Sequence, residues 1–335
     1  MTTPEPRLPL AMTIGEPAGI GPELALLTWL RRAEVGAPFF IIADPAALRE
    51  SARRLALDVP IAVVGPADAV EIFERALPVA PLSVSAAATP GQPDSSFARA
   101  TIESIERAVG YVRSGEASAV VTNPIAKHVL YEAGFAFPGH TEFLGELARP
   151  WGQNAKPVML LWSSLLCVAP VTIHIALADV PRALTRELIV STARIVAADM
   201  RKRFGLARPR LAVAGLNPHA GEGGAIGREE IETIGPAIAQ LRAEGLDVTG
   251  PHPADTMFHA AARRRYDVAL TMYHDQGLIP IKTLAFDTGV NVTLGLPFVR
   301  TSPDHGVAFD IAGKGLANPA SLIEAARLAA RLAAA

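Results

Sequence analysis

Short apolar runs, each followed by a turn and a helix signal, recur along the first part of the chain and constrain its fold more than any other feature. Pro9–Ile14 precedes a helix that can begin at Pro22, and Phe39–Ala43 precedes one that can begin at Pro45. Such runs are typical of strands covered on both faces, and proline suits the first turn of a helix. Repeated strand and helix units imply a mostly parallel sheet. The sequence therefore predicts an α/β fold with α/β/α layers.

One segment departs from this parallel pattern. Val158–Trp162 and Leu165–Ile173, separated by Ser163 and Ser164, indicate an antiparallel hairpin. With 335 residues, the chain is long enough for two modest domains. We therefore expect two lobes that share a central cleft, with the hairpin marking a second subdomain or a dimer-forming arm.

The composition excludes several classes of partner. Half of the residues are apolar, 19% are charged and the formal net charge is -2, so the chain has no general attraction for nucleic acid or an anionic membrane. No uninterrupted apolar segment reaches the roughly 20 residues that a bilayer requires. Cys167 is the only cysteine, which excludes internal disulfides and thiolate zinc clusters. We expect a cytoplasmic protein whose anionic ligands are held by local cations.

Three histidines follow apolar runs, where ligands gather in open parallel sheets. His274 ends the run from Val268, His174 ends a second run, and His219 lies just past a third. Neutral imidazoles bind zinc and similar ions, and three of them leave positions open for water or substrate. We interpret them as candidate ligands of a catalytic metal, with Asp275 as a supplementary carboxylate. Alternatively, each histidine is a hydrogen-bonding loop residue.

A second set of candidates can bind an oxyanion. Lys282, Asn291 and Arg300 each lie beside an apolar run and can donate hydrogen bonds to phosphate or carboxylate. His140 and Thr141 add a donor pair in a loop. The alternatives are solvated surface cations and, for Thr141, a helix cap.

Lys127, one turn into a helix expected from Pro124, is a candidate catalytic amine if it is desolvated. The glycine clusters Gly15–Gly21 and Gly221–Gly227 precede helices, but neither matches a dinucleotide or P-loop fingerprint. By themselves they indicate tight turns.

Five sequence blocks run in order along almost the whole chain: Gly15–Glu23, Phe137–Phe143, Gly215–Gly224, Met272–Gly277 and Gly289–Ser302. Together they resemble the 4-hydroxythreonine-4-phosphate dehydrogenase family of pyridoxal phosphate biosynthesis. The segment Asp304–Pro319 is also similar to the cofactor loop of isopropylmalate and isocitrate dehydrogenases. The resemblance implies that superfamily's fold and cofactor contacts from His305, Gly306, Gly313 and Asn318.

The resemblance further implies one divalent metal per site (zinc, magnesium or cobalt) held by His174, His219 and His274, with ligands shared across a homodimer. It implies substrate contacts from a second set of residues, namely His140, Thr141, Lys282, Asn291 and Arg300. The implied reaction is NAD- or NADP-dependent oxidation of 4-phosphohydroxy-L-threonine, followed by loss of carbon dioxide to give 3-amino-2-oxopropyl phosphate. Lys127 and a metal-bound water are the candidate proton acceptors.

By analogy, residues 1–125 and 301–335 would form the first lobe, on the cofactor-loop side. Residues 126–300 would form the second, with the metal, the substrate and the dimer interface. Three other functions stay open. They are a dehydrogenase of threonate or erythronate 4-phosphate, a phosphate acyltransferase, against which the histidines argue, and a non-catalytic binder of a phosphorylated ligand.

Overall fold

The computed structural model describes residues 8–152 and 155–335. These residues divide into two compact units, the first running to Pro157 and resuming at Leu296–Ala334, and the second covering Val158–Gly295. The divisions therefore lie at 157/158 and 295/296, whereas we expected them at 125/126 and 300/301. As a result His140, Thr141 and Arg300, which we expected in the second lobe, belong to the first unit.

The first unit alternates strands with helices, as its proline-marked turns predicted. Its strands are β1 (Leu10–Thr13), β2 (Phe39–Ala43), β3 (Ile61–Val63), β4 (Leu77–Pro81), β5 (Val120–Val121) and β12 (Arg300–Pro303). Its α-helices are α1 (Gly21–Leu30), α2 (Arg32–Val35), α3 (Pro45–Arg54), α4 (Pro66–Ile72), α5 (Ala98–Arg113), α6 (Lys127–Glu132), α7 (His140–Leu147) and α13 (Ala320–Ala333).

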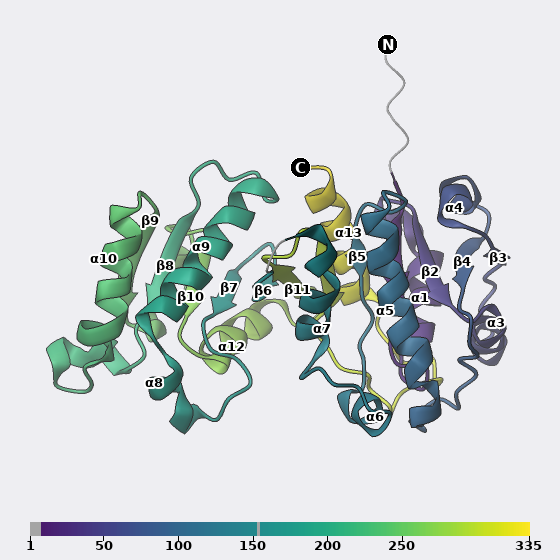
Figure 1. Ribbon diagram of the computed structural model, residues 1–335, viewed down its shortest axis with the longest axis horizontal. Coiled ribbons are helices and arrows are strands. Elements are labelled where there is room, and N and C mark those ends of the chain that lie inside the picture. The colour runs from purple at the N-terminus through teal and green to yellow at the C-terminus, as the bar shows by residue number, and fades with distance from the viewer. Residues whose placement is uncertain (1–7, 153–154) are drawn as a thin grey trace, which may run out of the picture. The chain divides into compact units, whose positions relative to one another are not determined.

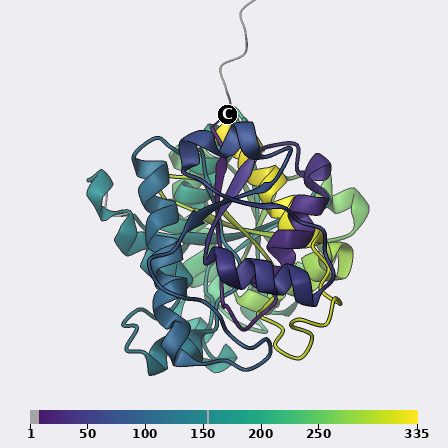
Figure 2. The ribbon, with the colours of Figure 1, turned by 90° about the vertical axis from the view of Figure 1, so that its right-hand side faces the viewer.

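Every strand pairing in this unit is parallel, in the order β3-β4-β2-β1-β5-β12. Helix α5 packs on β1 and β2, while α13 packs on β12 and contacts α1. Figures 1 and 2 show α5 on one face of these strands and α1 with α13 on the other. Ala11, Phe40 and Val120 face α5 in one buried apolar cluster. The α/β layering expected from the sequence is confirmed here.

The second unit mixes strand directions. Its elements are β6 (Val158–Trp162), β7 (Cys167–Pro170), α8 (Val180–Ala183), α9 (Arg186–Lys202), β8 (Arg210–Ala214), α10 (Gly235–Ala243), β9 (Asp247–His252), α11 (Ala260–Arg263), β10 (Val268–Thr271), α12 (His274–Ala285) and β11 (Val290–Leu294). The order is β11-β6-β7-β10-β8-β9. The β6 and β7 strands form the predicted antiparallel hairpin, and β11 also pairs antiparallel with β6. The other pairings are parallel.

Several local predictions need correction. The helix expected from Pro124 begins at Lys127, because Asn123 and Pro124 are held in an extended segment by bonds to Thr13 and Glu16. The strand expected to deliver His274 ends at Thr271, and His274 is instead the first residue of α12. Despite these changes, Lys127 still follows the carboxyl end of β5 and His274 still follows the carboxyl end of β10.

Two helices follow each other closely in the second unit. Helix α8 ends at Ala183 and α9 begins at Arg186. Between them Thr185 caps α9, because its hydroxyl accepts a hydrogen bond from the Leu188 amide at 3.1 Å. Among the described residues, no helix is both long and apolar enough to span a bilayer.

Asp44 links a helix start to a loop. Its carboxylate accepts hydrogen bonds from the Ala46 amide at 2.9 Å, at the start of α3, and from the Ala86 amide at 3.0 Å. Burial alone would raise the pKa of Asp44, but the hydrogen bonds from Ala86, Ala46 and Ser85 outweigh it and lower the pKa. A carboxyl whose pKa is lower in the folded than in the unfolded chain adds stability at neutral pH, and this stability is lost on acidification.

We predict that Asp44→Ala lowers the free energy of unfolding by about 1–2 kcal/mol at pH 7 because the helix loses its cap. The difference from the wild type should shrink as the pH falls below about 4 and through the lowered pKa of the folded state, beneath which the carboxyl is protonated in both states. Urea unfolding at several pH values measures it. Exposed Asp58, changed to alanine, serves as the control, and an equal effect of the two substitutions would contradict the prediction.

Candidate functional site

Two of the predicted metal ligands lie side by side in the second unit. The imidazole rings of His174 and His274 have centroids 5.6 Å apart and are inclined by 43°. Both line a pocket of about 260 Å³, together with Thr172 and Tyr273. The position of His174 follows from a left-handed backbone, with φ of 52°. Such a conformation is uncommon for a residue other than glycine, although histidine tolerates it better than most.

His274 is oriented by its neighbour. Its Nδ1 lies 2.7 Å from Oδ1 of Asp275, whose carboxylate is largely exposed. If Nδ1 donates this bond, Nε2 is left as the acceptor, which is the arrangement of a metal-binding histidine with an outer carboxylate. The helix start is fixed by Gln276, which accepts from the Met272 amide at 2.7 Å and donates to the Gly215 carbonyl at 2.7 Å.

His219 lies on an unusual loop. Residues 219–223 all have positive φ, and His219 itself is exposed. Glu230 holds the start of this loop, because its Oε1 accepts from the amides of Leu216 at 2.7 Å and Asn217 at 2.8 Å. A β-carbon at Gly221 would lie 2.6 Å from Glu230 Oε2, so only glycine fits there. The glycine cluster is therefore built around a buried carboxylate.

The predicted histidine trio is only partly assembled in a single chain. Over residues 8–152 and 155–335, no group of three or more histidine, cysteine, aspartate or glutamate side chains is arranged to hold a metal ion. The paired rings of His174 and His274 supply two adjacent imidazoles, a donor set that suits zinc or a similar divalent ion. His219 belongs to no such group among the residues that the structure describes.

A buried guanidinium forms the centre of the polar cluster in the first unit. Arg300, on β12, is 5% exposed, and its Nε and Nη2 donate to Thr122 Oγ1 at 3.1 and 2.6 Å. Burial lowers the pKa of Arg300 to about 9. Nη2 also lies 3.4 Å from His140 Nδ1. The fold thus brings together Arg300 and His140, which we predicted separately as donors to an oxyanion.

His140 is held as a neutral donor. Burial lowers the pKa of His140 well below its usual value, and the positive charges of Arg300 and Lys127 add to the effect. Because Nδ1 faces the Arg300 guanidinium and accepts from it, Nε2 carries the proton. This Nε2 atom is buried and has no hydrogen-bond partner in the described structure. It is available to donate to an oxyanion.

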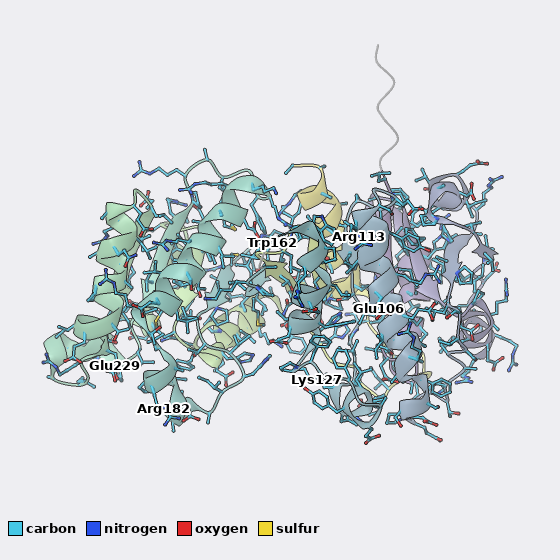
Figure 3. The ribbon with its side chains drawn as sticks, viewed as in Figure 1. Glu106, Arg113, Lys127, Trp162, Arg182 and Glu229 are labelled. Atoms are coloured by element: carbon cyan, nitrogen blue, oxygen red, sulfur yellow. The ribbon has the colours of Figure 1, made fainter. Side chains whose placement is uncertain are left out.

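The other predicted substrate-binding and catalytic residues are divided between the two units. Thr141 is the second residue of α7, and the helix cap is Gly139 instead of Thr141. Lys127 is exposed (Figure 3), and its Nζ would lie 3.2 Å from a β-carbon at Gly139. Lys282, in α12, and Asn291, in β11, belong to the second unit.

The predicted cofactor segment is anchored in the first unit. Glu23 of α1 is 3% exposed and accepts from the amides of Gly313 at 3.1 Å and Ala317 at 3.3 Å. The His305 Nδ1 lies 3.1 Å from the Gly306 carbonyl, and its Nε2 is buried without a partner in the described structure. Asn318 accepts from the Ala320 amide at 3.0 Å, at the start of α13. Its oxygen therefore already serves the helix start.

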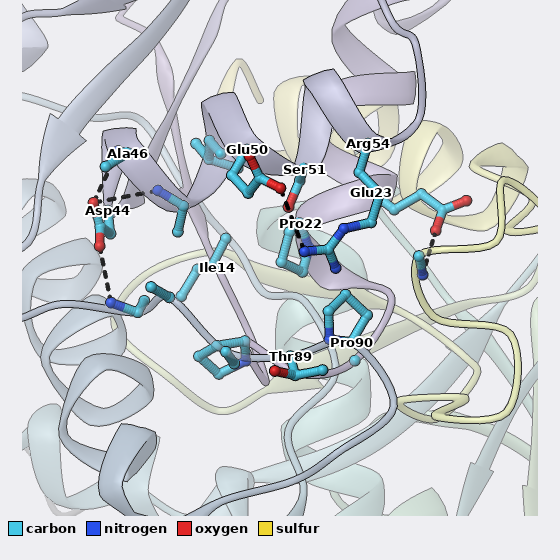
Figure 4. Close-up of a pocket in the computed structure, with 18 of the residues that line it drawn as sticks. Ile14, Pro22, Glu23, Asp44, Ala46, Glu50, Ser51, Arg54, Thr89 and Pro90 are labelled. Atoms are coloured by element: carbon cyan, nitrogen blue, oxygen red, sulfur yellow. Dashed lines mark hydrogen bonds and ion pairs between the residues drawn. The ribbon is translucent and has the colours of Figure 1, made fainter.

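A cavity of about 270 Å³ adjoins this segment. It is lined by Gly313, by Glu50 and Arg54 of α3, and by Thr89 and Pro90 (Figure 4). The unpartnered polar atom of His305 and a cavity beside Gly313 fit a polar organic cofactor such as a nicotinamide dinucleotide.

Sequence reasoning missed four supporting residues: Glu16, Thr122, Asn123 and Glu230. Glu16 falls within the recognised block Gly15–Glu23, and Thr122 and Asn123 are polar residues directly after an apolar run, which was a usable signal. Nothing in the sequence distinguishes Glu230 from the neighbouring acidic residues Glu229 and Glu232.

Known proteins resemble this chain over nearly its full length. The family model described as "Pyridoxal phosphate biosynthetic protein PdxA" matches residues 34–329. A protein of Methylorubrum populi named 4-hydroxythreonine-4-phosphate dehydrogenase is 64% identical over 97% of this chain and 94% of its own length. One of the same name from Bradyrhizobium diazoefficiens is 59% identical over 98% of this chain and 97% of its own length.

A solved structure agrees with these matches. The crystal structure of 4-hydroxythreonine-4-phosphate dehydrogenase from Klebsiella pneumoniae has a TM-score of 0.85 and 37% identity, covering 97% of this chain and 99% of the other. Family model, sequence relatives and solved structure point to the same group of proteins. The chain belongs to the PdxA family of pyridoxal phosphate biosynthetic proteins.

Proposed function

We propose that this chain is an NAD(P)- and divalent-metal-dependent 4-hydroxythreonine-4-phosphate dehydrogenase. It oxidises the secondary alcohol of 4-phosphohydroxy-L-threonine to 2-amino-3-oxo-4-phosphooxybutanoate, which loses carbon dioxide to give 3-amino-2-oxopropyl phosphate. The buried cluster of Arg300, Thr122 and His140 is the observation that carries the proposal. It supplies preorganised donors for a phosphate, the group that the names of the relatives specify.

Substrate binding uses the predicted donors. The Arg300 guanidinium and the protonated Nε2 of neutral His140 bind oxyanion oxygens, and Thr141 lies next to His140 at the start of α7. The family resemblance also assigns Lys282 and Asn291, in the second unit, to substrate binding. Because the phosphate takes no part in the oxidation itself, its binding energy serves to orient the neighbouring alcohol for hydride transfer.

His174, His219 and His274 would hold the divalent ion, which is zinc, magnesium or cobalt. Such an ion, when bound, lowers the pKa of the substrate hydroxyl and later withdraws electrons from the ketone during decarboxylation. The residues of the chain fix the imidazoles: Asp275 orients His274, and Glu230 holds the loop that carries His219. Lys127, exposed beside Gly139, is the candidate acceptor for the hydroxyl proton.

NAD or NADP, when bound, would supply the acceptor for the hydride that leaves the alcohol carbon. We assign cofactor binding to the loop that contains His305, Gly306 and Gly313, with Asn318 at its end. Gly313 lines the cavity beside α3, and Glu23 anchors the loop beneath it. The loop therefore has a fixed backbone on which a dinucleotide can lie.

We further propose a cytoplasmic homodimer whose subunits share metal ligands. Helix α12, which begins with His274, exposes Ile279 by 64%, and Phe286, the residue that follows its last turn, is 74% exposed. Large apolar side chains exposed on one helix favour coverage by a partner. A partner on this helix would approach the residues that begin it.

The nearest alternative is a dehydrogenase of threonate or erythronate 4-phosphate, which would use the same phosphate donors and metal ligands. The two activities differ in the group at carbon 2 of the substrate, an ammonium in one case and a hydroxyl in the other. A site that holds one of these groups by hydrogen bonds discriminates strongly against the other.

We expect the purified protein to form NADH or NADPH from 4-phosphohydroxy-L-threonine, to lose this activity after treatment with a chelator, and to regain it with zinc, magnesium or cobalt. Absorbance of the reduced cofactor measures the rate. Threonate 4-phosphate and erythronate 4-phosphate, assayed in parallel, test the alternative substrates. Absence of reduced cofactor with every substrate would favour a non-catalytic binder.

The support that Thr122 gives to Arg300 can be measured in substrate binding. Thr122→Val removes the hydroxyl that accepts from both Nε and Nη2 of Arg300, and we expect KM for the phosphorylated substrate to rise about tenfold or more, with a smaller change in kcat. Thr122→Ser keeps the hydroxyl and should restore KM. A rise in KM of the same size in both variants would contradict this role.

The loop that carries His219 depends on Glu230. We expect Glu230→Gln to weaken zinc binding by about tenfold to a hundredfold, because the acceptor that orients the loop is altered while the volume is kept. Calorimetric titration with zinc measures this without turnover. Glu232→Gln, at a side chain that is 59% exposed, is the matched control. Equal zinc affinity in the two variants would contradict the prediction.

A further inference from the structure

An isolated carboxyl lies at the end of the first strand. Glu16 follows β1 in the loop before α1 and is 1% exposed. Its Oε1 accepts a hydrogen bond from the Ala18 amide at 3.1 Å, but Oε2 is buried and has no hydrogen-bond partner in the described structure. Burial raises the pKa of Glu16. A buried polar atom without a partner costs about 1–3 kcal/mol, so its retention requires an explanation.

A second buried acceptor comes from the neighbouring loop. Asn123 is fully buried, and its Nδ2 donates to the Thr13 carbonyl at 2.9 Å. That bond fixes the amide so that Oδ1 is left without a partner among the described groups. The two loops are in direct contact: the Glu16 amide donates to the Pro124 carbonyl at 2.9 Å. A β-carbon at Gly15 would lie 2.7 Å from Cβ of Asn123, which leaves no room for another side chain.

These acceptors lie between the proposed substrate donors and the proposed cofactor loop. Asn123 directly follows Thr122, which binds the Arg300 guanidinium. Toward the proposed cofactor loop, which includes Val307, the Ile20 amide donates a hydrogen bond to the Val307 carbonyl at 3.0 Å. Gly19 allows this approach, because a β-carbon there would be 2.9 Å from the same carbonyl oxygen. All of these contacts lie within the first unit.

We propose that Glu16 and Asn123 bind the carboxamide amino group of the nicotinamide ring. The two oxygens can only accept hydrogen bonds while Glu16 is ionised, and the carboxamide offers two N–H donors on one nitrogen. The nicotinamide ring has to lie beside the substrate alcohol for hydride transfer, which places its carboxamide near the residue after Thr122. The ionised carboxyl also favours the positively charged oxidised ring over the neutral reduced one. The inference rests on the proposed dehydrogenase function.

The test compares cofactor analogues by equilibrium binding. The 3-acetylpyridine analogue of NAD replaces the amino group of the carboxamide with a methyl group and cannot donate. We expect the wild-type protein to bind NAD about tenfold or more tightly than this analogue, as the loss of a hydrogen bond to a charged group predicts. Calorimetry provides both dissociation constants without turnover.

Substitution of Glu16 should remove this preference. In Glu16→Ala the acceptor is gone, and in the nearly isosteric Glu16→Gln the side-chain oxygen can satisfy the Ala18 amide while its amino group faces the ligand. We expect NAD and the acetylpyridine analogue to bind either variant with similar affinity. Glu71→Gln, at an exposed side chain of α4, should keep the wild-type preference. Circular dichroism checks that each variant is folded, and the glutamine variant preserves the test if the alanine variant is not.

The remaining outcomes separate the two proposals. If the wild-type protein binds neither NAD nor NADP, the dehydrogenase function fails. If it binds NAD, but the Glu16 variants keep the wild-type preference, only the carboxamide site is overturned. It is also overturned if the variants lose discrimination against nicotinamide hypoxanthine dinucleotide, which would assign Glu16 to the adenine amino group. Weaker binding of 4-phosphohydroxy-L-threonine with an unchanged analogue ratio would assign it to the substrate ammonium and would likewise overturn the proposal.

Discussion

The polar cluster of the first unit depends on the parallel pairing of β5 with β12. In this register Arg300 lies opposite Val120 and Thr301 opposite Val121, so that Thr122 follows directly and its hydroxyl reaches the guanidinium. A slip of one residue would turn these side chains to the other face of the sheet. An enclosed guanidinium without its acceptor would be strongly unfavourable. The pairing of β5 with β12 therefore also fixes the position of Arg300, the candidate phosphate-binding group.

Buried polar groups in this protein fall into two kinds. Glu23, Glu103 and Glu230 each accept hydrogen bonds from backbone amides of a loop, which they fix in place. By contrast, Glu16, Asn123, His140 and His305 each leave one buried atom unpartnered in the described structure. The loops that carry the second kind lie after β1, after β5, at the start of α7 and after β12. Groups of the first kind hold the fold, and groups of the second kind lie where a parallel sheet receives its ligands.

The sequence predicted the elements that local signals define. Proline and an apolar run set the start of α3 at Pro45, and the two serines between apolar runs marked the β6 and β7 hairpin. The site residues were harder to predict. The bond from Arg300 to Thr122 joins residues 178 positions apart, and the left-handed segment after Pro218 depends on Glu230. Such positions are fixed by tertiary contacts that residue spacing does not contain, although the family resemblance named several of the ligand-binding side chains.

Two of the candidate metal ligands, His174 and His219, share an uncommon backbone conformation. His174 and His219 both have φ of 52°, a conformation that costs most residues of order 1–3 kcal/mol and persists only where the surroundings impose it. Around His219 the imposing group is Glu230, which fixes the amides of Leu216 and Asn217 before the left-handed stretch begins. A loop selected only for stability would place glycine at such positions. Ala220 and Glu222 share this conformation with His219, so the strain belongs to the loop as a whole, which presents the proposed metal ligand His219 at the surface.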